Sequence, residues 1–231
     1  MPCLSVTKYR SESVTTIKRH FLHLLLAASW IMTLAACSKD DDPIVAYRQD
    51  LAEIATDHNG RVATLILDNA DTLAVTNKEA ITQTLVPDTA YRVRAVFLKE
   101  AQGAEVVSLQ TVFCMAPLAE KPAEMKADAI TAEAIWRSGR YLNLLVSFKT
   151  SGAEKHKIMF VEDGITTEAN GAKMLHIKLT HDRRNDGRTY TTRSYISCLL
   201  SGYNDILMPQ RDSVSIAVPT GNGFSIRHFA Y

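Results

Sequence analysis

The sequence has little of the residue types that mark specialised classes of protein. Its 231 residues include only ten glycines and seven prolines, and 26 basic against 25 acidic side chains leave a net charge of +1. The low glycine and proline content excludes collagen, and 46% hydrophobic residues exclude a disordered chain. The lack of a basic excess gives no reason to expect nucleic-acid binding. A globular protein of one large or two small domains remains.

The sequence also lacks the short motifs of common catalytic sites. It contains no Cys-x-x-Cys, His-Glu-x-x-His or Gly-x-Ser-x-Gly, and no phosphate-binding glycine loop. His176 and His181 are five residues apart on a predicted strand, so they face opposite sides and cannot share a metal without a bulge. We therefore expect no metal, no cofactor and no enzymatic activity. A hydrolase with dispersed catalytic residues stays open as an alternative.

The first 36 residues have the pattern of a secretory signal. Residues 1–20 carry four basic side chains and one acidic one, and residues 21–36 are mostly apolar. This stretch is shorter than the roughly 20 residues that span a bilayer. The segment Leu34-Ala35-Ala36-Cys37 resembles the lipobox of bacterial lipoproteins. The resemblance implies cleavage before Cys37 and its acylation with fatty acids such as palmitate, and two or more acyl chains give stable anchoring.

An acidic tether follows the lipidated cysteine over residues 37–43. It resembles the export signal of Bacteroidetes surface lipoproteins, which implies the outer face of the outer membrane. A solvated spacer beside the membrane is the alternative interpretation. The residues of the expected export signal are Lys39, Asp40, Asp41 and Asp42.

Removal of the signal changes the composition of the chain. It leaves 195 residues with 22 basic and 24 acidic side chains, so the net charge becomes −2. Only Cys114 and Cys198 then remain as thiols. The cell envelope permits disulfides, so the two either form a bridge or lie as small buried residues.

The rest of the chain has the two-residue period of β-strands. Apolar side chains alternate in 91–98 and 105–113, with Gly103 in the turn between them. In 91–98, Arg92 and Arg94 share the face opposite the apolar one. Asp186-Gly187 predicts a hairpin turn between two later strands. The remaining predicted strands are 61–67, 141–148, 157–161, 174–180, 189–199, 213–218 and 224–229.

A proline-containing stretch divides these strands into two groups. Pro117 and Pro122 cannot sit inside a central strand, so we place a linker at 117–127. Any helix is expected within 119–134. The chain is therefore predicted to be all-β, with a small β domain over 44–116 and an antiparallel β-sandwich over 128–231.

Two segments of the second half carry a family resemblance. Trp136 with 138–144, and the strand 175–182, resemble the NigD-like lipoproteins of Bacteroidetes, which have a similar tryptophan, glycine turn, Tyr-Leu-Asn strand and His-Asp strand end. The tip Asn185-Asp186-Gly187 matches loosely because two arginines precede it. The resemblance covers nearly all of the mature chain. It implies an OB-like barrel at 44–116 followed by the β-sandwich, and brings no enzymatic activity.

Basic side chains gather in the sequence near that tip. We interpret them either as a solvated tip or as a glycan or anion patch. We expect a lipid-anchored envelope protein that binds a protein or glycan and no nucleic acid. The alternative is an immunity lipoprotein, which the family's association with a bacteriocin operon implies. The residues of the candidate patch are His181, Arg183, Arg184, Arg188 and Arg193.

Overall fold

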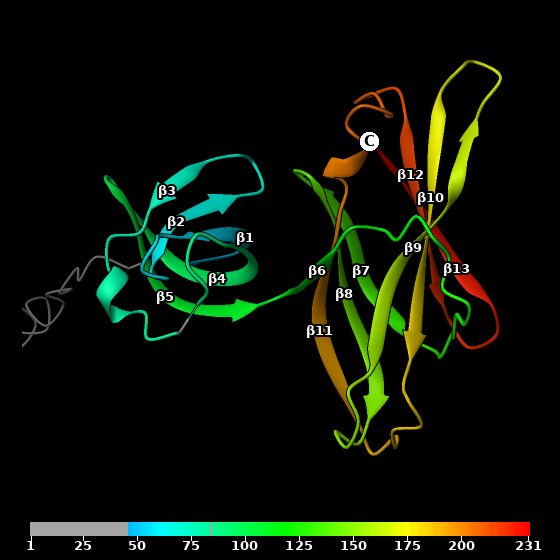
Figure 1. Cartoon of the computed structure of the whole chain (residues 1–231), viewed down its shortest axis with the longest axis horizontal. Helices are drawn as coiled ribbons and strands as arrows, with labels where there is room; N and C mark the ends of the chain where they lie inside the picture. Colours follow the sequence, from blue (N-terminus) through cyan, green and yellow to red (C-terminus); the bar gives the residue numbers. More distant parts are fainter. Residues whose placement is uncertain (1–45, 84) are drawn as a thin grey trace, which may run out of the picture. The chain divides into compact units, whose positions relative to one another are not determined.

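The computed structural model describes residues 46–83 and 85–231, so Cys37 and the acidic tether lie outside the described residues. Residues 46–231 form one compact unit, with thirteen strands and two short 3-10 helices among the described residues (Figure 1). The buried apolar side chains divide into two clusters, one in a barrel and one in a sandwich. Within this described part, no helix is long and apolar enough to cross a membrane. The predicted all-β class is confirmed.

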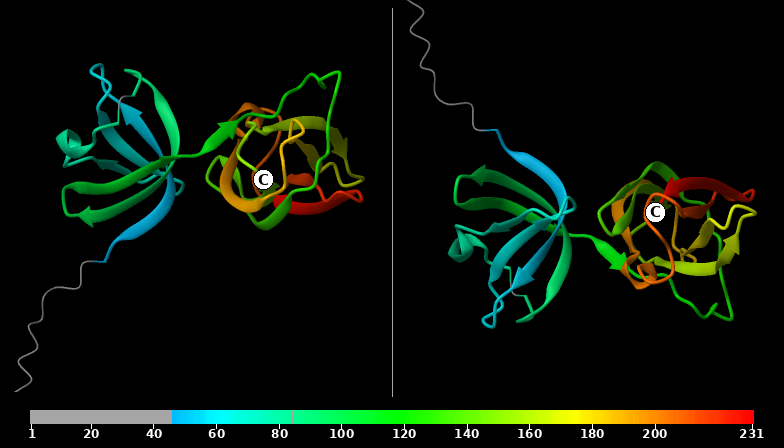
Figure 2. Two further views of the ribbon diagram at one scale, coloured as in Figure 1. Left: turned by 90° about the horizontal axis from the view of Figure 1, so that it is seen from below. Right: turned by 90° about the horizontal axis from the view of Figure 1, so that it is seen from above.

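The first five strands curl into a partly open barrel (Figure 2). The order is β3-β2-β1-β4-β5, and Val75 beside β3 forms a parallel bridge with Ala104 of β5. Gly103 permits this approach, because a Cβ there would lie 2.2 Å from the carbonyl oxygen of Ala74. Such a barrel is OB-like, as predicted. The elements are β1 (Arg48–Thr56), β2 (Val62–Leu67), β3 (Thr72–Ala74), η1 (Lys78–Ala80), β4 (Ala90–Glu100) and β5 (Gly103–Thr111).

Strand β4 shows how the side-chain pattern builds the barrel. Val93, Ala95 and Phe97 are at most 1% exposed and face the barrel core. Burying a side chain such as phenylalanine contributes roughly 1.5–3 kcal/mol. Arg92 and Arg94 lie on the other face, because successive side chains of a strand alternate. The strand therefore supplies both the core and a polar outer face.

The remaining strands form a sandwich of two four-stranded sheets, β13-β12-β10-β9 and β6-β11-β8-β7. Most pairs are antiparallel, as predicted, but β10 with β12 and β11 with β6 are parallel. The elements are β6 (Phe113–Met115), β7 (Thr131–Ser138), β8 (Tyr141–Thr150), β9 (Lys157–Thr167), β10 (Lys173–Asp182), β11 (Tyr190–Leu199), η2 (Ser201–Tyr203), β12 (Ser213–Pro219) and β13 (Phe224–Ala230).

The predicted hairpin at Asp186-Gly187 is wrong. Strands β10 and β11 lie in different sheets, so residues 183–189 connect the two layers of the sandwich. Asp186 is 2% exposed and accepts hydrogen bonds from Thr150 and Ser151. Its carboxylate therefore anchors the connection to the end of β8, whereas the tip of a hairpin would leave it in solvent.

The predicted linker is attached to the sandwich. The Leu118 N–H donates to the Phe160 carbonyl at 2.9 Å, and Ala127 forms a bridge with His181. Phe113–Met115, placed in the first domain by the sequence, pairs with β11 as strand β6 of the sandwich. The described residues show no helix within 119–134, where extended backbone continues into β7. Two prolines and these pairings keep the segment extended.

Candidate functional site

A buried arginine of the barrel contacts the sandwich. Arg92 is 4% exposed, and its guanidinium binds both carboxylate oxygens of Asp68 at 2.5 and 2.8 Å. It also donates to Asn143 Oδ1 at 3.1 Å and Ser197 Oγ at 3.3 Å. Its Cζ lies 3.8 Å from the centre of the Tyr141 ring. The barrel and the sandwich thus both supply partners for this buried cation, at the junction between the two domains.

A second contact lies beside the first. Arg140 Nε donates to Glu53 Oε1 at 3.0 Å, and Arg140 Nη2 donates to the other oxygen of Glu53. Gly139 has a φ of +54°, and a Cβ there would lie 2.4 Å from the carbonyl oxygen of Asp68. Only glycine permits this approach of the β7–β8 turn to the β2–β3 turn. Burial raises the pKa of Tyr141 well above its usual range, and the Glu53 carboxylate raises it further.

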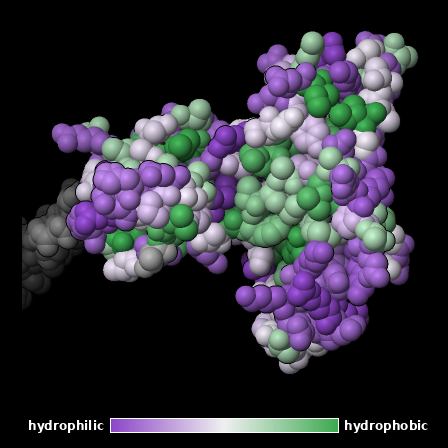
Figure 3. Space-filling model, viewed as in Figure 1, coloured by the Kyte–Doolittle hydropathy of each residue, from purple (hydrophilic) through white to green (hydrophobic). Residues whose placement is uncertain are grey.

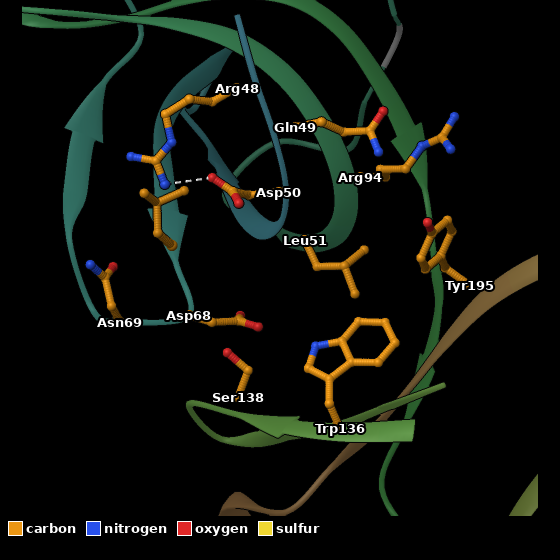
Figure 4. Close-up of a pocket in the computed structure, with 11 residues that line it drawn as sticks. Arg48, Gln49, Asp50, Leu51, Asp68, Asn69, Arg94, Trp136, Ser138 and Tyr195 are labelled. Carbon is orange, nitrogen blue, oxygen red and sulfur yellow. Dashed lines mark hydrogen bonds and ion pairs between the residues drawn. The ribbon is translucent and has the colours of Figure 1, made fainter. Parts of the chain in front are cut away.

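A polar hollow of about 430 Å³ opens at this junction (Figure 4). Trp136 lies across its floor, and Ser138 and Asp68 line the adjoining side. Figure 4 places Arg94 beside Tyr195 at one end. The hollow is lined by Arg48, Gln49, Asp50, Leu51, Leu67, Asp68, Asn69, Arg94, Trp136, Ser138 and Tyr195.

A second hollow of about 540 Å³ shares Arg94 and Tyr195 with the first. We call the two hollows together the junction groove. Exposed hydrophobic residues are visible on the sandwich in Figure 3, and Phe113 in the second hollow is 44% exposed. The second hollow is lined by Arg94, Gln110, Thr111, Val112, Phe113, Leu145, His156, Ile158, Arg193, Ser194, Tyr195 and Ile196.

The charges of the junction groove are unequally paired. Arg48 binds Asp50 at 2.7 Å, and Arg193 binds Glu133. The Arg94 side chain makes no hydrogen bond or ion pair with another described residue, and its guanidinium lies 5.6 Å from the centre of the Tyr195 ring. Among the described residues, Arg94 is therefore the arginine of the groove that has no counterion.

The structure does not gather the basic patch that the sequence suggested. His181 is 1% exposed and packs inside the sandwich. Arg183 donates to the Asp186 carbonyl, while Arg184 and Arg188 are exposed on the connection between the sheets. Arg193 alone lines the junction groove, since β11 carries it to the barrel side of the sandwich. The five residues therefore divide among the sandwich interior, the connection over residues 183–189 and the junction groove.

His181 belongs to a buried chain of hydrogen bonds. Its Nδ1 lies 3.1 Å from the Asp128 carbonyl oxygen and its Nε2 lies 2.9 Å from His156 Nδ1. His156 Nε2 lies 3.1 Å from Asp186 Oδ2. A carbonyl only accepts, so a neutral His181 must accept from His156 through Nε2. His156 Nδ1 then donates to His181, and its Nε2 faces the Asp186 carboxylate.

Burial sets the protonation of this chain. It lowers the pKa of His181, and the charge of His156 lowers it further, against the opposing effect of the Asp128 carbonyl. Donors from Ser151 and Thr150 hold the pKa of Asp186 well below its usual range. His181 is therefore the member of the chain that is held neutral.

The two cysteines do not form the disulfide that the sequence left open. Both are free in the structure. Cys114 pairs with Ser197 and Cys198 pairs with Met115 in adjacent strands, and paired residues share a face. The two thiols therefore lie on opposite faces of the sheet. Burial raises the pKa of both thiols.

Among the described residues, no serine is hydrogen-bonded to a histidine that in turn is hydrogen-bonded to a carboxylate, as a catalytic triad requires. Ser215 Oγ lies 2.9 Å from His176 Nδ1, but His176 Nε2 faces the Thr166 hydroxyl and no carboxylate. Ser151 donates directly to Asp186, so no histidine stands between them. The same described residues contain no group of three or more side chains placed to hold a metal.

The fold and groove define a two-domain β protein, an OB-like barrel joined to a sandwich. Residues 114–228 match the family model of the NigD-like C-terminal beta sandwich domain. The second domain of this protein is therefore a NigD-like C-terminal sandwich, and the resemblance predicted from the sequence is confirmed. The match begins at β6, which fits the pairing of that strand with the sandwich. No curated protein matches the chain in sequence.

Solved structures share the fold at low sequence identity. A NigD-like immunity protein from Bacteroides caccae is 23% identical with a TM-score of 0.61, over 82% of this chain and 97% of that one. A candidate toxin-related protein from Parabacteroides distasonis is 15% identical with a TM-score of 0.63, over 80% and 93%. A protein of unknown function from Bacteroides vulgatus is 16% identical with a TM-score of 0.58, over 80% and 91%.

Sequence reasoning missed the roles of Arg92, Arg94 and Trp136. The signal was present, because two arginines alternate with core residues in one strand and a tryptophan precedes a glycine turn. A two-residue period, however, shows only that a face is polar. It does not show that another domain covers it.

We predict that Arg92→Met lowers the free energy of unfolding by about 3–5 kcal/mol, because it strands the Asp68 carboxylate at a buried site. The side chains of Arg92 and Asp68 are only 1% and 12% exposed. Chemical denaturation measures the change. Arg48→Met is the matched control, since it breaks an exposed pair worth about 0–1 kcal/mol. Equal losses in the two variants would contradict a junction held by Arg92.

We also predict that stability falls as the pH drops below about 6.5, the usual pKa of histidine. The folded state holds His181 neutral while the unfolded chain binds a proton, so unfolding is favoured until the pH reaches the lowered pKa of His181. Denaturation between pH 7 and pH 5 should show a shallower pH dependence for His181→Gln than for the unsubstituted protein. His58→Gln, at an exposed turn, should keep the original slope. An unchanged slope in His181→Gln would refute this assignment.

Proposed function

We propose that this protein is a non-catalytic binding protein of the cell envelope and that its partner binds in the junction groove. The observation that carries the proposal is the shape of the groove. Two hollows of about 430 and 540 Å³ share Arg94 and Tyr195. Ligand sites are typically concave, of this size, and placed where two domains meet.

The chemistry of the groove supports binding rather than catalysis. Its side chains include the aromatic rings of Phe113, Trp136 and Tyr195, amides, and a guanidinium that has no counterion among the described residues. Such groups hold and orient a ligand, but none is placed as a nucleophile beside a general base. The NigD-like sandwich agrees with a non-catalytic role.

We further propose that the protein is anchored to the outer membrane through acyl chains on Cys37. The support is the signal pattern before Cys37, and Lys39, Asp40, Asp41 and Asp42 favour export to the cell surface. Few residues separate Cys37 from Arg48, where β1 begins. The barrel would therefore stay close to the membrane, since an extended residue spans only about 3.5 Å.

A second candidate function is immunity to a bacteriocin. It is favoured by the similar fold of the protein from Bacteroides caccae, which is named as a NigD-like immunity protein. An immunity protein would also act by binding, so the junction groove would then hold a toxin. The two candidates differ in whether loss of the groove makes the cell sensitive to a bacteriocin.

We predict that Cys37→Ala releases the protein from the membrane fraction, because no thiol is left to accept the lipid. Cell fractionation and labelling with a fatty-acid analogue measure this. As a further arm, replacement of Asp40, Asp41 and Asp42 by alanine should keep the lipid label but reduce digestion by protease added to intact cells. Lipid label on Cys37→Ala would contradict the anchor, and unchanged digestion would leave the acidic run as a spacer.

We predict that a photo-activated residue at Asn69, which is exposed in the first hollow, forms a discrete adduct on intact cells. Adding Ser138→Trp should abolish the adduct by filling the hollow. The matched control is the same residue at Asn222, which is exposed on the β12–β13 turn. Identical adducts at both positions, or an adduct that survives Ser138→Trp, would argue against the groove. Bacteriocin sensitivity of cells carrying Ser138→Trp would favour immunity.

A further inference from the structure

We infer that the ligand of the junction groove is an acidic oligosaccharide, with a sugar carboxylate at Arg94 and a sugar ring against Trp136. This inference rests on the proposed function, because it names the class of ligand for the same groove. It is carried by two observations: the pairing of the charges and the side chains around the indole.

The charges favour a ligand that carries a carboxylate. The second hollow is lined by Arg94, Arg193 and His156, and no aspartate or glutamate is among its lining residues. Arg193 and His156 have counterions in Glu133 and Asp186. Arg94 has no such partner among the described residues. A carboxylate is the natural counterion for a guanidinium, because two parallel hydrogen bonds match its geometry.

The first hollow favours a ligand rich in hydroxyl groups. Trp136 is half-buried and meets Tyr195 edge to face, with ring centres 6.4 Å apart and an 84° angle between the planes. This contact fixes the indole. Gln49, Asn69 and Ser138 supply donors and acceptors around it. A sugar uses both features, since its ring has an apolar face and its rim carries hydroxyls.

The size of the groove indicates more than one sugar unit. The two hollows share Arg94 and Tyr195 in their linings, so a ligand that occupies both would contact these two side chains. Each hollow alone has a volume in the usual range for small-molecule sites. OB-like barrels also bind oligosaccharides in other proteins. Here the ligand would contact the outer faces of β1 and β4.

The test measures binding of acidic oligosaccharides to the full mature chain by calorimetry at an ionic strength of about 0.15 M. The probes are oligomers of galacturonate, alginate, hyaluronan and chondroitin, each compared with its carboxyl-reduced form. At least one acidic oligomer should bind, and its reduced form should bind at least 10-fold more weakly, because it has lost the charge-assisted bond. Hexaglutamate is included to represent an acidic peptide.

Two variants locate the binding. Arg94→Gln should weaken it by about 10- to 100-fold, as expected for a hydrogen bond to a charged group. Trp136→Ala should weaken binding of the acidic and the reduced oligomer alike, because it removes the surface for the ring. The matched control is Arg227→Gln, an exposed arginine on β13, which should bind normally. Circular dichroism checks that each variant is folded.

Three results with the oligosaccharides would overturn the inference. They are no binding of any acidic oligomer up to about 1 mM, equal binding of the reduced forms, or binding that Arg94→Gln leaves unchanged. Hexaglutamate binding as tight as that of the oligosaccharides would overturn it in favour of an acidic peptide. These failures are separate from failure of the proposed function. A discrete adduct at Asn69 on cells would keep the groove as the binding site while the sugar is rejected.

Discussion

The junction groove depends on one buried cation, the guanidinium of Arg92. Removing a charge from water costs several kcal/mol unless the protein replaces the lost hydration. Here Asp68 of the barrel and Asn143 and Ser197 of the sandwich provide that replacement together. The barrel supplies only part of these partners, so separation of the domains would break the hydrogen bonds from Arg92 to Asn143 and Ser197. This requirement holds the walls of the groove in place.

The sequence predicted the strands better than it predicted their surroundings. Alternation in 91–98 correctly placed Val93 in the core. In the predicted strand 141–148, Tyr141 and Asn143 alternate with the core residues Leu142 and Leu144 and so take the opposite face. These two are nevertheless only 4% and 0% exposed, because the barrel covers their face. Side-chain period reports polarity, and a polar face can meet water or a second domain. The side-chain period therefore cannot predict buried ion pairs between domains.

The candidate site was harder to predict than the fold because its members are far apart in the chain. The lining comes from strands of both domains, together with the turn after β2; the strands are β1, β2, β4, β5, β6, β7, β8, β9 and β11. Sequence reasoning instead selected residues that are neighbours in the chain, such as Arg183 and Arg184. His181, chosen with them, proved to be part of a buried hydrogen-bonded chain. Only tertiary structure brings Arg94 to Trp136.

The spacing of Arg92 and Arg94 has a consequence for strand register. Both lie on one face of β4, which is paired on both sides by β1 and β5. A slip of one residue would turn Val93 and Ala95 outward and both arginines into the barrel core. The register of β4 with β1 and β5 therefore determines three properties together: the packing of the barrel core, the attachment of the two domains and the charge of the groove. None of the three can change by sliding β4 without losing the other two.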